Sequence, residues 1–212
     1  IDSRILNELS QHLSTVPNDR FHTEEVSRLF RKILSRPGRI GLTLEAMHQA
    51  SLLEKLVPAF ARVRGLMQFN QYHKYTEDEH SLLAVKEAER LQEEQGLVGE
   101  VYRQIVDKDI FHLALLLHDL GKGRPGDHCK IGQEITHKMA DRLGLSEKER
   151  EVLAFLVFHH LVMSHTAFRR DLNDLKIIQA FARKMKTVAV LQKMFILTVA
   201  DISAVGPEVM TK

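Results

Sequence analysis

Apolar residues recur along most of this chain at the three-to-four-residue spacing of amphipathic helices. Breakers are few, and no alternating stretch is long enough to predict a strand. The predicted fold class is therefore all-α. The expected helices cover residues 2–16, 23–35, 42–57, 77–95, 100–106, 109–120, 130–144, 147–162, 174–185 and 187–204.

Two of the expected helices begin with a capping motif. Thr76 stands three residues before Glu79, and Ser146 stands three residues before Glu149. In such a capping box the two residues satisfy each other's backbone N–H groups, which would otherwise be free at a helix start. We therefore expect helices to begin close to residues 77 and 147.

The chain is predicted to divide into two helical parts. The link GLMQFNQYHKY, residues 65–75, separates the N-terminal helices from a longer helical region. We place an N-terminal helical segment at residues 1–70 and a larger domain at residues 71–212.

Composition and charge narrow the class of protein. The 212 residues are 44% hydrophobic, which is enough for a sizeable core, and the formal net charge of +2 gives no broad electrostatic attraction for nucleic acid or membrane. The single cysteine, Cys129, excludes an internal disulfide and fits a reducing cytoplasm. We expect no apolar run to approach the length of a membrane span, and no signal peptide is visible. Because the chain opens on Ile1, we expect a fragment of a longer protein.

Histidine and acidic side chains repeatedly follow or interrupt strongly apolar segments. Such side chains must be hydrogen-bonded, paired or bound to an ion when they are buried. Imidazoles combined with carboxylates suit Mn, Fe, Co, Ni or Zn, whereas an oxygen-rich magnesium site would use fewer histidines. The positions concerned are His80 on the first turn of a helix, His118 and Asp119 after LLL, His128 in the loop GDHCKIG, His159 and His160 after VLAFLVF, and Asp201 within MFILTVADISAV.

A histidine taken alone is more often a satisfied core or surface residue than a ligand. We expect six other histidines of this chain to be ordinary core or surface residues of this kind. His73 is ambiguous because it lies in the polar link. The combination of several such residues at the ends of apolar helices is what favours one shared metal site. The six are His12, His22, His48, His112, His137 and His165.

Four segments carry a resemblance to a known family: YHKYTEDEH, LLLHDLGKGRPGDH, HHLVMSHTAFRRDLND and LTVADISAVGP. Their H…HD…D pattern resembles the HD superfamily of metal-dependent phosphohydrolases. More closely, they resemble the central HD domain of the bacterial PII uridylyltransferase/uridylyl-removing enzymes, from about residue 20 to the end of the chain. The resemblance implies an HD-domain helical bundle with additional N-terminal helices.

The resemblance also implies a set of metal ligands. One or two divalent ions are expected, drawn from Mn, Fe, Mg, Co, Ni and Zn. Neighbouring residues on a helix point about 100° apart, so the choice between His159 and His160 stays open. The first ion would take His80, His118, Asp119 and Asp201, and the second would take His128 and His159 or His160, with Asp119 bridging.

The implied reaction is hydrolysis of a tyrosyl–UMP phosphodiester, which releases UMP from the uridylylated PII signal protein. Lys122 is placed to meet a phosphate oxygen, although it could instead be a solvated lysine at a helix end. Arg169 and Arg170 are candidates for gripping the substrate, or they could pair with Asp171 and Asp174.

The family's nucleotidyltransferase Gly-Ser motif and paired aspartates are not found in this sequence, and we expect the family's regulatory domains to lie outside it. We therefore expect no uridylylation and no glutamine sensing by this chain alone. Two other functions remain open. One is an HD hydrolase of a small nucleotide, and the other is a non-catalytic helical module for regulation.

Overall fold

In the computed structural model, residues 3–67 and 75–205 are described, and they form helices without a strand. The all-α prediction is confirmed. The helices in chain order are α1 Ser3–Thr15, η1 Asn18–His22, α2 Glu24–Leu34, α3 Ile40–Gln49, α4 Leu53–Leu56, η2 Pro58–Arg62, α5 Glu77–Arg90, α6 Leu97–Gln104, α7 Lys108–Leu117, α8 His128–Leu143, α9 Glu147–His159, α10 Val162–Arg169, α11 Leu175–Met185 and α12 Val188–Val205.

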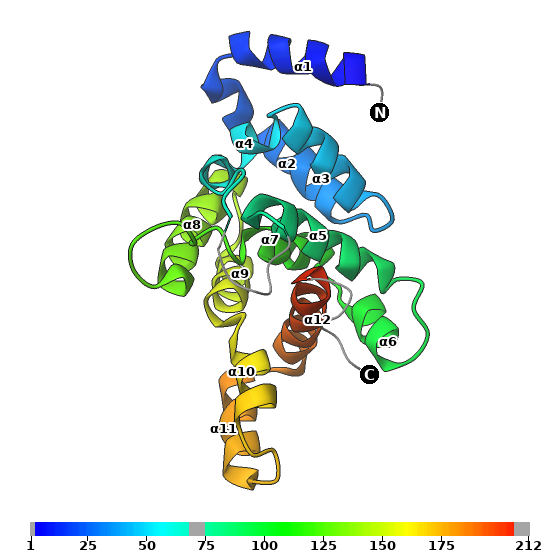
Figure 1. The fold of residues 1–212 in the computed structure, drawn as a ribbon, viewed down its shortest axis with the longest axis vertical. Helices are drawn as coiled ribbons and strands as arrows, with labels where there is room; N and C mark the ends of the chain where they lie inside the picture. The colour runs from blue at the N-terminus through cyan, green and yellow to red at the C-terminus, as the bar shows by residue number, and fades with distance from the viewer. Residues whose placement is uncertain (1–2, 68–74, 206–212) are drawn as a thin grey trace.

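Helix α7 runs through the middle of the hydrophobic core (Figure 1). Its residues 110–117 are all buried, as expected for a helix that is apolar on every side. Helices α2, α5, α9 and α12 pack around it, and α5 also packs along α12 and α3. The C-terminal end of α7 is therefore enclosed by other helices, so any polar group there lies in the interior.

The two predicted capping boxes are confirmed, at the starts of α5 and α9. The backbone N–H of Thr76 donates to Oε2 of Glu79 over 3.1 Å. The backbone N–H of Ser146 donates to Oε2 of Glu149 over 2.8 Å. The first of these caps fixes the start of α5, which carries His80 on its first turn.

One predicted helix is broken in the structure. The range 42–57 contains α3 and α4, and between them Ser51 adopts a φ of 60°. A left-handed residue ends a helix, so α4 starts in a new direction. The N-terminal region thus turns more often than its hydrophobic pattern suggests.

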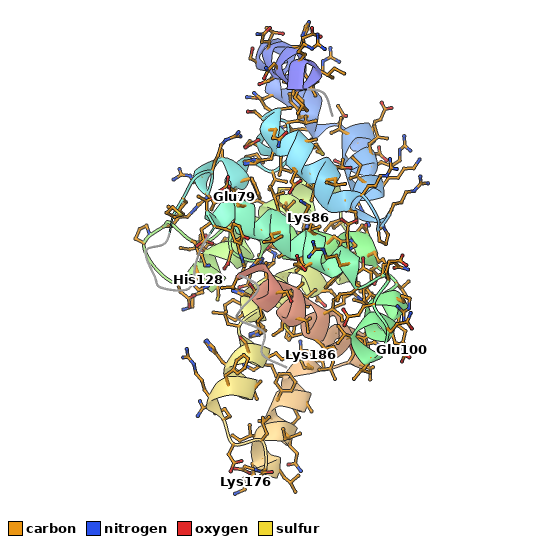
Figure 2. All side chains as sticks on the ribbon, turned by 45° about the vertical axis from the view of Figure 1, so that its right-hand side comes forward. Glu79, Lys86, Glu100, His128, Lys176 and Lys186 are labelled. Atoms are coloured by element: carbon orange, nitrogen blue, oxygen red, sulfur yellow. The ribbon has the colours of Figure 1, made fainter. Side chains whose placement is uncertain are left out.

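The segment after α9 also differs from the prediction. Helix α9 ends at His159, and α10, which was not predicted, follows it. No residue of α10 is buried, and α11 buries only Met185. The two helices project from the body of the molecule as a hairpin, and Figure 2 shows Lys176 at its far tip, well away from His128.

Two stretches, Glu147–Arg169 and Val188–Val205, are long and apolar enough to cross a membrane by length and composition alone. The expectation that no segment approaches that length is therefore wrong. Both stretches contain core helices, since α9 packs on α7 and α8, and α12 packs on α5. The core helix of a globular protein passes the same test. The predicted domain boundary near residue 70, like His73, lies outside the described residues and stays a prediction.

Candidate metal centre

Four side chains that can bind a metal lie close together in the interior, and they come from three helices. His80 comes from α5, Asp201 from α12, and His118 and Asp119 from the end of α7. Their ligand atoms all lie within 4.8 Å of one another. Nε2 of His80 is 3.0 Å from Oδ1 of Asp201, and Nε2 of His118 is 3.2 Å from Oδ2 of Asp119. The structure thus brings together the four residues expected around a first ion, which we term the deep group.

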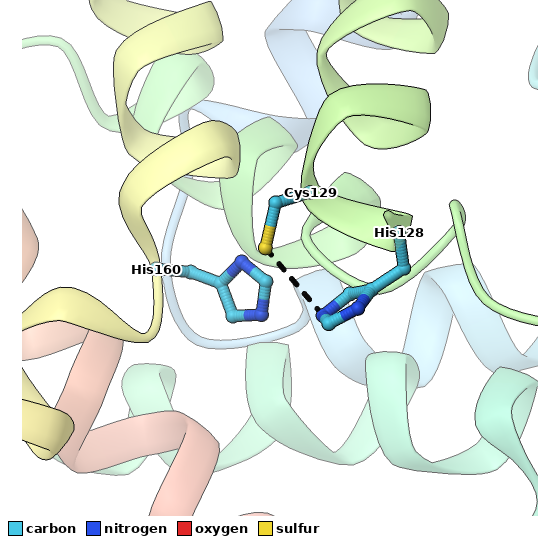
Figure 3. A group of neighbouring side chains, drawn as sticks. All are labelled: His128, Cys129 and His160. Carbon is cyan, nitrogen blue, oxygen red and sulfur yellow. Dashed lines mark hydrogen bonds between the residues drawn. The ribbon is translucent and has the colours of Figure 1, made fainter. Parts of the chain in front are cut away.

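A second group adjoins the first and consists of His128, Cys129 and His160 (Figure 3). His128 and Cys129 are the first residues of α8, and His160 follows the last residue of α9. His128 was expected in a loop, but α8 begins two residues earlier than predicted. We term these three residues the shallow group, because His128 and Cys129 are only half-buried.

Asp119 connects the two groups. Its Oδ2 faces His118 in the deep group, whereas its Oδ1 lies 3.5 Å from Nε2 of His160 in the shallow group. Asp119 is 3% exposed, and its Oδ1 has no hydrogen-bond partner among the described residues. A buried carboxylate oxygen without a hydrogen bond is costly, so positive charge is favoured beside it, either as a proton on His160 or as a metal ion.

Backbone contacts orient two of the imidazole rings. Nδ1 of His118 lies 2.7 Å from the carbonyl oxygen of Leu115, and Nδ1 of His160 lies 2.8 Å from that of Val157. A carbonyl accepts but cannot donate, so each Nδ1 carries the hydrogen. In the neutral rings Nε2 then presents a lone pair to the cluster, which is the usual arrangement of a metal-binding histidine.

The pKa shifts of the clustered side chains show that the cluster favours positive charge. Burial opposes protonation of His118, yet the carboxylates of Asp119 and Asp201 raise its pKa well above the usual value. Burial also opposes protonation of His160, but Asp119 and Cys129 raise its pKa to about 9. Despite their burial, the pKa values of Asp119 and Asp201 are held low, chiefly by His118. Protons bind where a divalent ion would bind, and the imidazole and carboxylate donors fit a borderline transition metal.

Lys122 is not a solvated lysine at a helix end. Its Nζ lies 2.7 Å from Oδ2 of Asp119 and 3.1 Å from Oε2 of Glu77, a carboxylate that is 2% exposed. Burial disfavours the charged lysine, but both carboxylates raise its pKa, so it stays protonated. Lys122 therefore places a fixed positive charge at the edge of the deep group.

The turn between α7 and α8 is packed against the start of α8. A Cβ on Gly121 would lie 2.0 Å from the carbonyl oxygen of His128, so only glycine fits there. Gly123 adopts a φ of 71°, which also favours glycine. The turn formed by these glycines holds the end of α7, with Asp119, against the start of α8, with His128.

His159 lies outside the cluster. Its ring packs against Phe155 and Phe158, with ring centroids 4.6 and 4.7 Å away. Burial and the nearby positive charges of Lys184 and Lys186 lower the pKa of His159. Of the two adjacent histidines, the structure thus places His160 among the metal-capable residues and not His159.

Arg169 and Arg170 are exposed at the end of α10, roughly 10 Å along its axis from the end near His160. In the described part of the chain neither pairs with Asp171 or Asp174. Those two acids instead hold backbone N–H groups, since Asp171 bonds Asn173 and Asp174 caps α11 at Lys176. The arginines are free to contact a partner.

Two polar residues of the centre were not predicted from the sequence, namely Cys129 and Glu77. Cys129 was visible as a lone cysteine beside His128, but its proximity to His160 depends on how α8 and α9 pack. Glu77 is 45 residues from Lys122 in the chain, and no pattern of neighbouring residues predicts an ion pair over that separation. Two of the histidines expected to be ordinary core or surface residues do have ordinary partners: His48 bonds Asp78 over 2.9 Å, and His112 bonds Tyr102 over 3.0 Å.

Comparison with known proteins places this geometry in a family. The HD domain family matches residues 78–202. A bifunctional uridylyltransferase/uridylyl-removing enzyme from Azospirillum brasilense is 39% identical over 98% of this chain and 23% of its own length. Proteins of the same name from Rhodospirillum rubrum and Cereibacter sphaeroides are 38% and 36% identical over 95% and 94% of this chain, each over 22% of their own length. The chain thus spans less than a quarter of the length of these relatives.

Proposed function

This chain belongs to the HD domain family, and from that premise we propose that it is a metal-dependent phosphodiesterase that removes uridylyl groups from a protein tyrosine. The observation that carries the proposal is Asp119, whose two oxygens face two groups of metal-capable side chains. The relatives are named for uridylyl removal, and the substrate we assign is the uridylylated PII signal protein.

In this proposal the deep group holds a first ion, and the shallow group holds a second. Asp119 contributes one oxygen to each position. Divalent ions bound there would lower the pKa of a water molecule and neutralise charge on the phosphoryl oxygens. The ligands are His80, His118, Asp119 and Asp201 for the first ion, and His128, His160 and Asp119 for the second.

The reaction consumes one water molecule. Its oxygen adds to phosphorus, and the bond from phosphorus to the tyrosine oxygen breaks. One proton of the water ends on the released phenol, and the other stays on the phosphate of UMP or passes to solvent. The products are UMP and the unmodified tyrosine side chain of the protein. Lys122, held between Asp119 and Glu77, supplies a fixed ammonium that attracts a phosphoryl oxygen as its charge grows.

A phosphodiester that is attached to a protein can reach the metal centre only if the centre is open to the surface. We assign Arg169 and Arg170, on the projecting hairpin, to contact with an acidic surface of PII. The proposal includes a cytoplasmic location and neither nucleic acid nor membrane as a partner. Uridylylation and its regulation belong, in this proposal, to the three quarters of the relatives' length that the chain does not span.

The test is release of UMP from uridylylated PII in the presence of Mn²⁺, with bis-p-nitrophenyl phosphate as a generic phosphodiester. Free nucleoside monophosphates are assayed in parallel. Hydrolysis of uridylylated PII in preference to the free nucleotides supports the proposal. Preference for a free nucleotide would assign a small-nucleotide hydrolase, and inactivity on every substrate with metal bound would assign a non-catalytic module.

A further inference from the structure

The shallow group contains an unusual donor for a site rich in imidazole and carboxylate. Cys129 is the only cysteine in the 212-residue sequence. Its Sγ lies 3.6 Å from Nε2 of His128, and the ring of His160 lies beside both (Figure 3). The backbone N–H of Cys129 donates to Oδ1 of Asp127 over 2.9 Å, which fixes the first turn of α8.

A second observation points to a ligand at the same place. The Oδ1 atom of Asp119 is buried and has no hydrogen-bond partner in residues 3–67 and 75–205. It faces His160, which is itself only 1% exposed. A cation beside His160 would satisfy this oxygen and the imidazole lone pair together.

Two of the distances between these donors agree with tetrahedral coordination. With typical zinc bond lengths, a sulfur and a nitrogen ligand lie about 3.6 Å apart, and a nitrogen and an oxygen ligand about 3.4 Å apart. The corresponding distances are 3.6 Å for Cys129 Sγ to His128 Nε2, and 3.5 Å for His160 Nε2 to Asp119 Oδ1. These two pairs of donors are therefore spaced as ligands of one ion would be.

We propose that Cys129 is a thiolate ligand of the second ion, together with His128, His160 and Oδ1 of Asp119. The proposal rests on the two-ion centre described above and adds a ligand that changes its metal preference. As the sulfur–metal bond forms, the thiol releases its proton to solvent, and nothing is oxidised or reduced. A thiolate favours zinc, iron(II) or cobalt(II) over magnesium or manganese, so the shallow position selects a softer ion than an all-oxygen-and-nitrogen site would.

Cobalt(II) gives a direct readout, because sulfur bound to cobalt produces a charge-transfer absorption in the near ultraviolet. The 212-residue chain, freed of metal, is titrated with Co²⁺ while absorbance and bound cobalt are measured. The absorption should grow with the second equivalent and be absent in Cys129→Ser. As a matched control, Lys130→Ser changes the adjacent exposed residue of α8 and should keep the absorption. Since the chain has no other cysteine, the signal has one possible source.

Zinc affinity and thiol accessibility provide independent readouts. Losing a residue that merely supports a ligand typically weakens metal binding about 10–100-fold, so Cys129→Ser should weaken the second zinc site by about 100-fold or more. Bound metal should also protect Cys129 from a thiol reagent. Circular dichroism checks that the variant is folded, and Cys129→Ala serves if the serine variant is not.

The contrary result is a wild-type protein that binds two cobalt ions without the sulfur absorption and whose thiol reacts equally fast with and without metal. Cys129 would then be only a hydrogen-bond partner of His128. The absorption is independent of turnover, so an inactive protein that shows it would overturn the proposed function and keep Cys129 as a ligand. An active protein that lacks the absorption would support the proposed function and would remove Cys129 from the set of ligands.

Discussion

The deep and shallow groups differ in how the chain builds them. The deep group comes from helices that meet in the core, and His80 and His118 are 2% and 0% exposed. The shallow group depends on the first turn of α8 and the end of α9, and two of its three members are only half-buried. The comparison teaches that one position is fixed by core packing, whereas the other is fixed by a turn and a helix start. The two should respond differently to substitution, to pH and to the choice of metal.

The largest effect is expected where the two groups join. Asp119→Ala removes a donor from both positions, so metal content should fall at both and UMP release should stop. Elemental analysis and the UMP assay on the same preparation test this. Normal UMP release by the variant would rule out the two-ion proposal altogether.

The shallow group can be removed selectively. His160→Ala should lower the metal content in excess Mn²⁺ from two ions towards one, because it removes a ligand of the second position only. His159→Ala is the matched control, and it should keep both ions since that ring packs against Phe155 and Phe158. Equal loss of metal in the two variants would contradict the assignment of His160.

Lys122 separates catalysis from metal binding. Lys122→Ala should keep the metal content and lower the turnover rate, since a protonated lysine cannot be a ligand. An ordered donor to developing phosphate charge is typically worth roughly 10²–10³ in rate. Steady-state kinetics with metal analysis measure both properties. Full activity in the variant would leave Lys122 only an ion-pairing role with Asp119 and Glu77.

The affinity for metal is expected to change gradually with pH, which is a smaller effect. In the metal-free protein the pKa of His118 is raised, and that of His160 is about 9, so both rings are protonated at neutral pH. A metal ion must displace these protons, and its affinity should rise up to about tenfold per pH unit for each proton released, until the pH passes about 9 for His160. Isothermal titration calorimetry with Mn²⁺ between pH 6 and 9 measures the slope. An affinity independent of pH would contradict the protonation assigned to the cluster.

The same pKa values set the stability of the metal-free protein. Because the folded-state pKa values exceed the usual histidine value, protonation stabilises the fold fully below about pH 6.5, and this contribution is lost as the pH rises through about 9 for His160. The Tm of the metal-free protein should therefore fall over this range. Bound metal should remove most of the decrease, which differential scanning calorimetry would show.

The sequence indicated for a physical reason that three residues of the deep group would lie in the interior. His118, Asp119 and Asp201 interrupt or follow apolar segments, and a helix that is apolar on all sides must bury whatever polar group it carries at its end. The capping box at Thr76 is also a signal between neighbouring residues, and it predicted the start of α5. The all-α class followed from the same spacing.

The sequence left open or missed the features that long-range contacts decide. His159 and His160 both follow the apolar run of α9, so only the packing of α8 and α7 around that helix end separates them. The break at Ser51 and the start of α8 at His128 depend on backbone angles that the hydrophobic pattern does not encode. Cys129 and Glu77 acquire their roles from residues far away in the chain.

The contact of Gly121 with the carbonyl oxygen of His128 has a consequence for protein engineering. It packs the turn after α7 against the first turn of α8 through main-chain atoms, and Asp127 caps that turn by accepting the backbone N–H of Cys129. Arg124 and Pro125 lie between these two fixed points, so they can be varied to alter what approaches the centre. Residues 124 and 125 are therefore suitable positions for a library that changes substrate choice, with Gly121 and Asp127 kept constant as anchors.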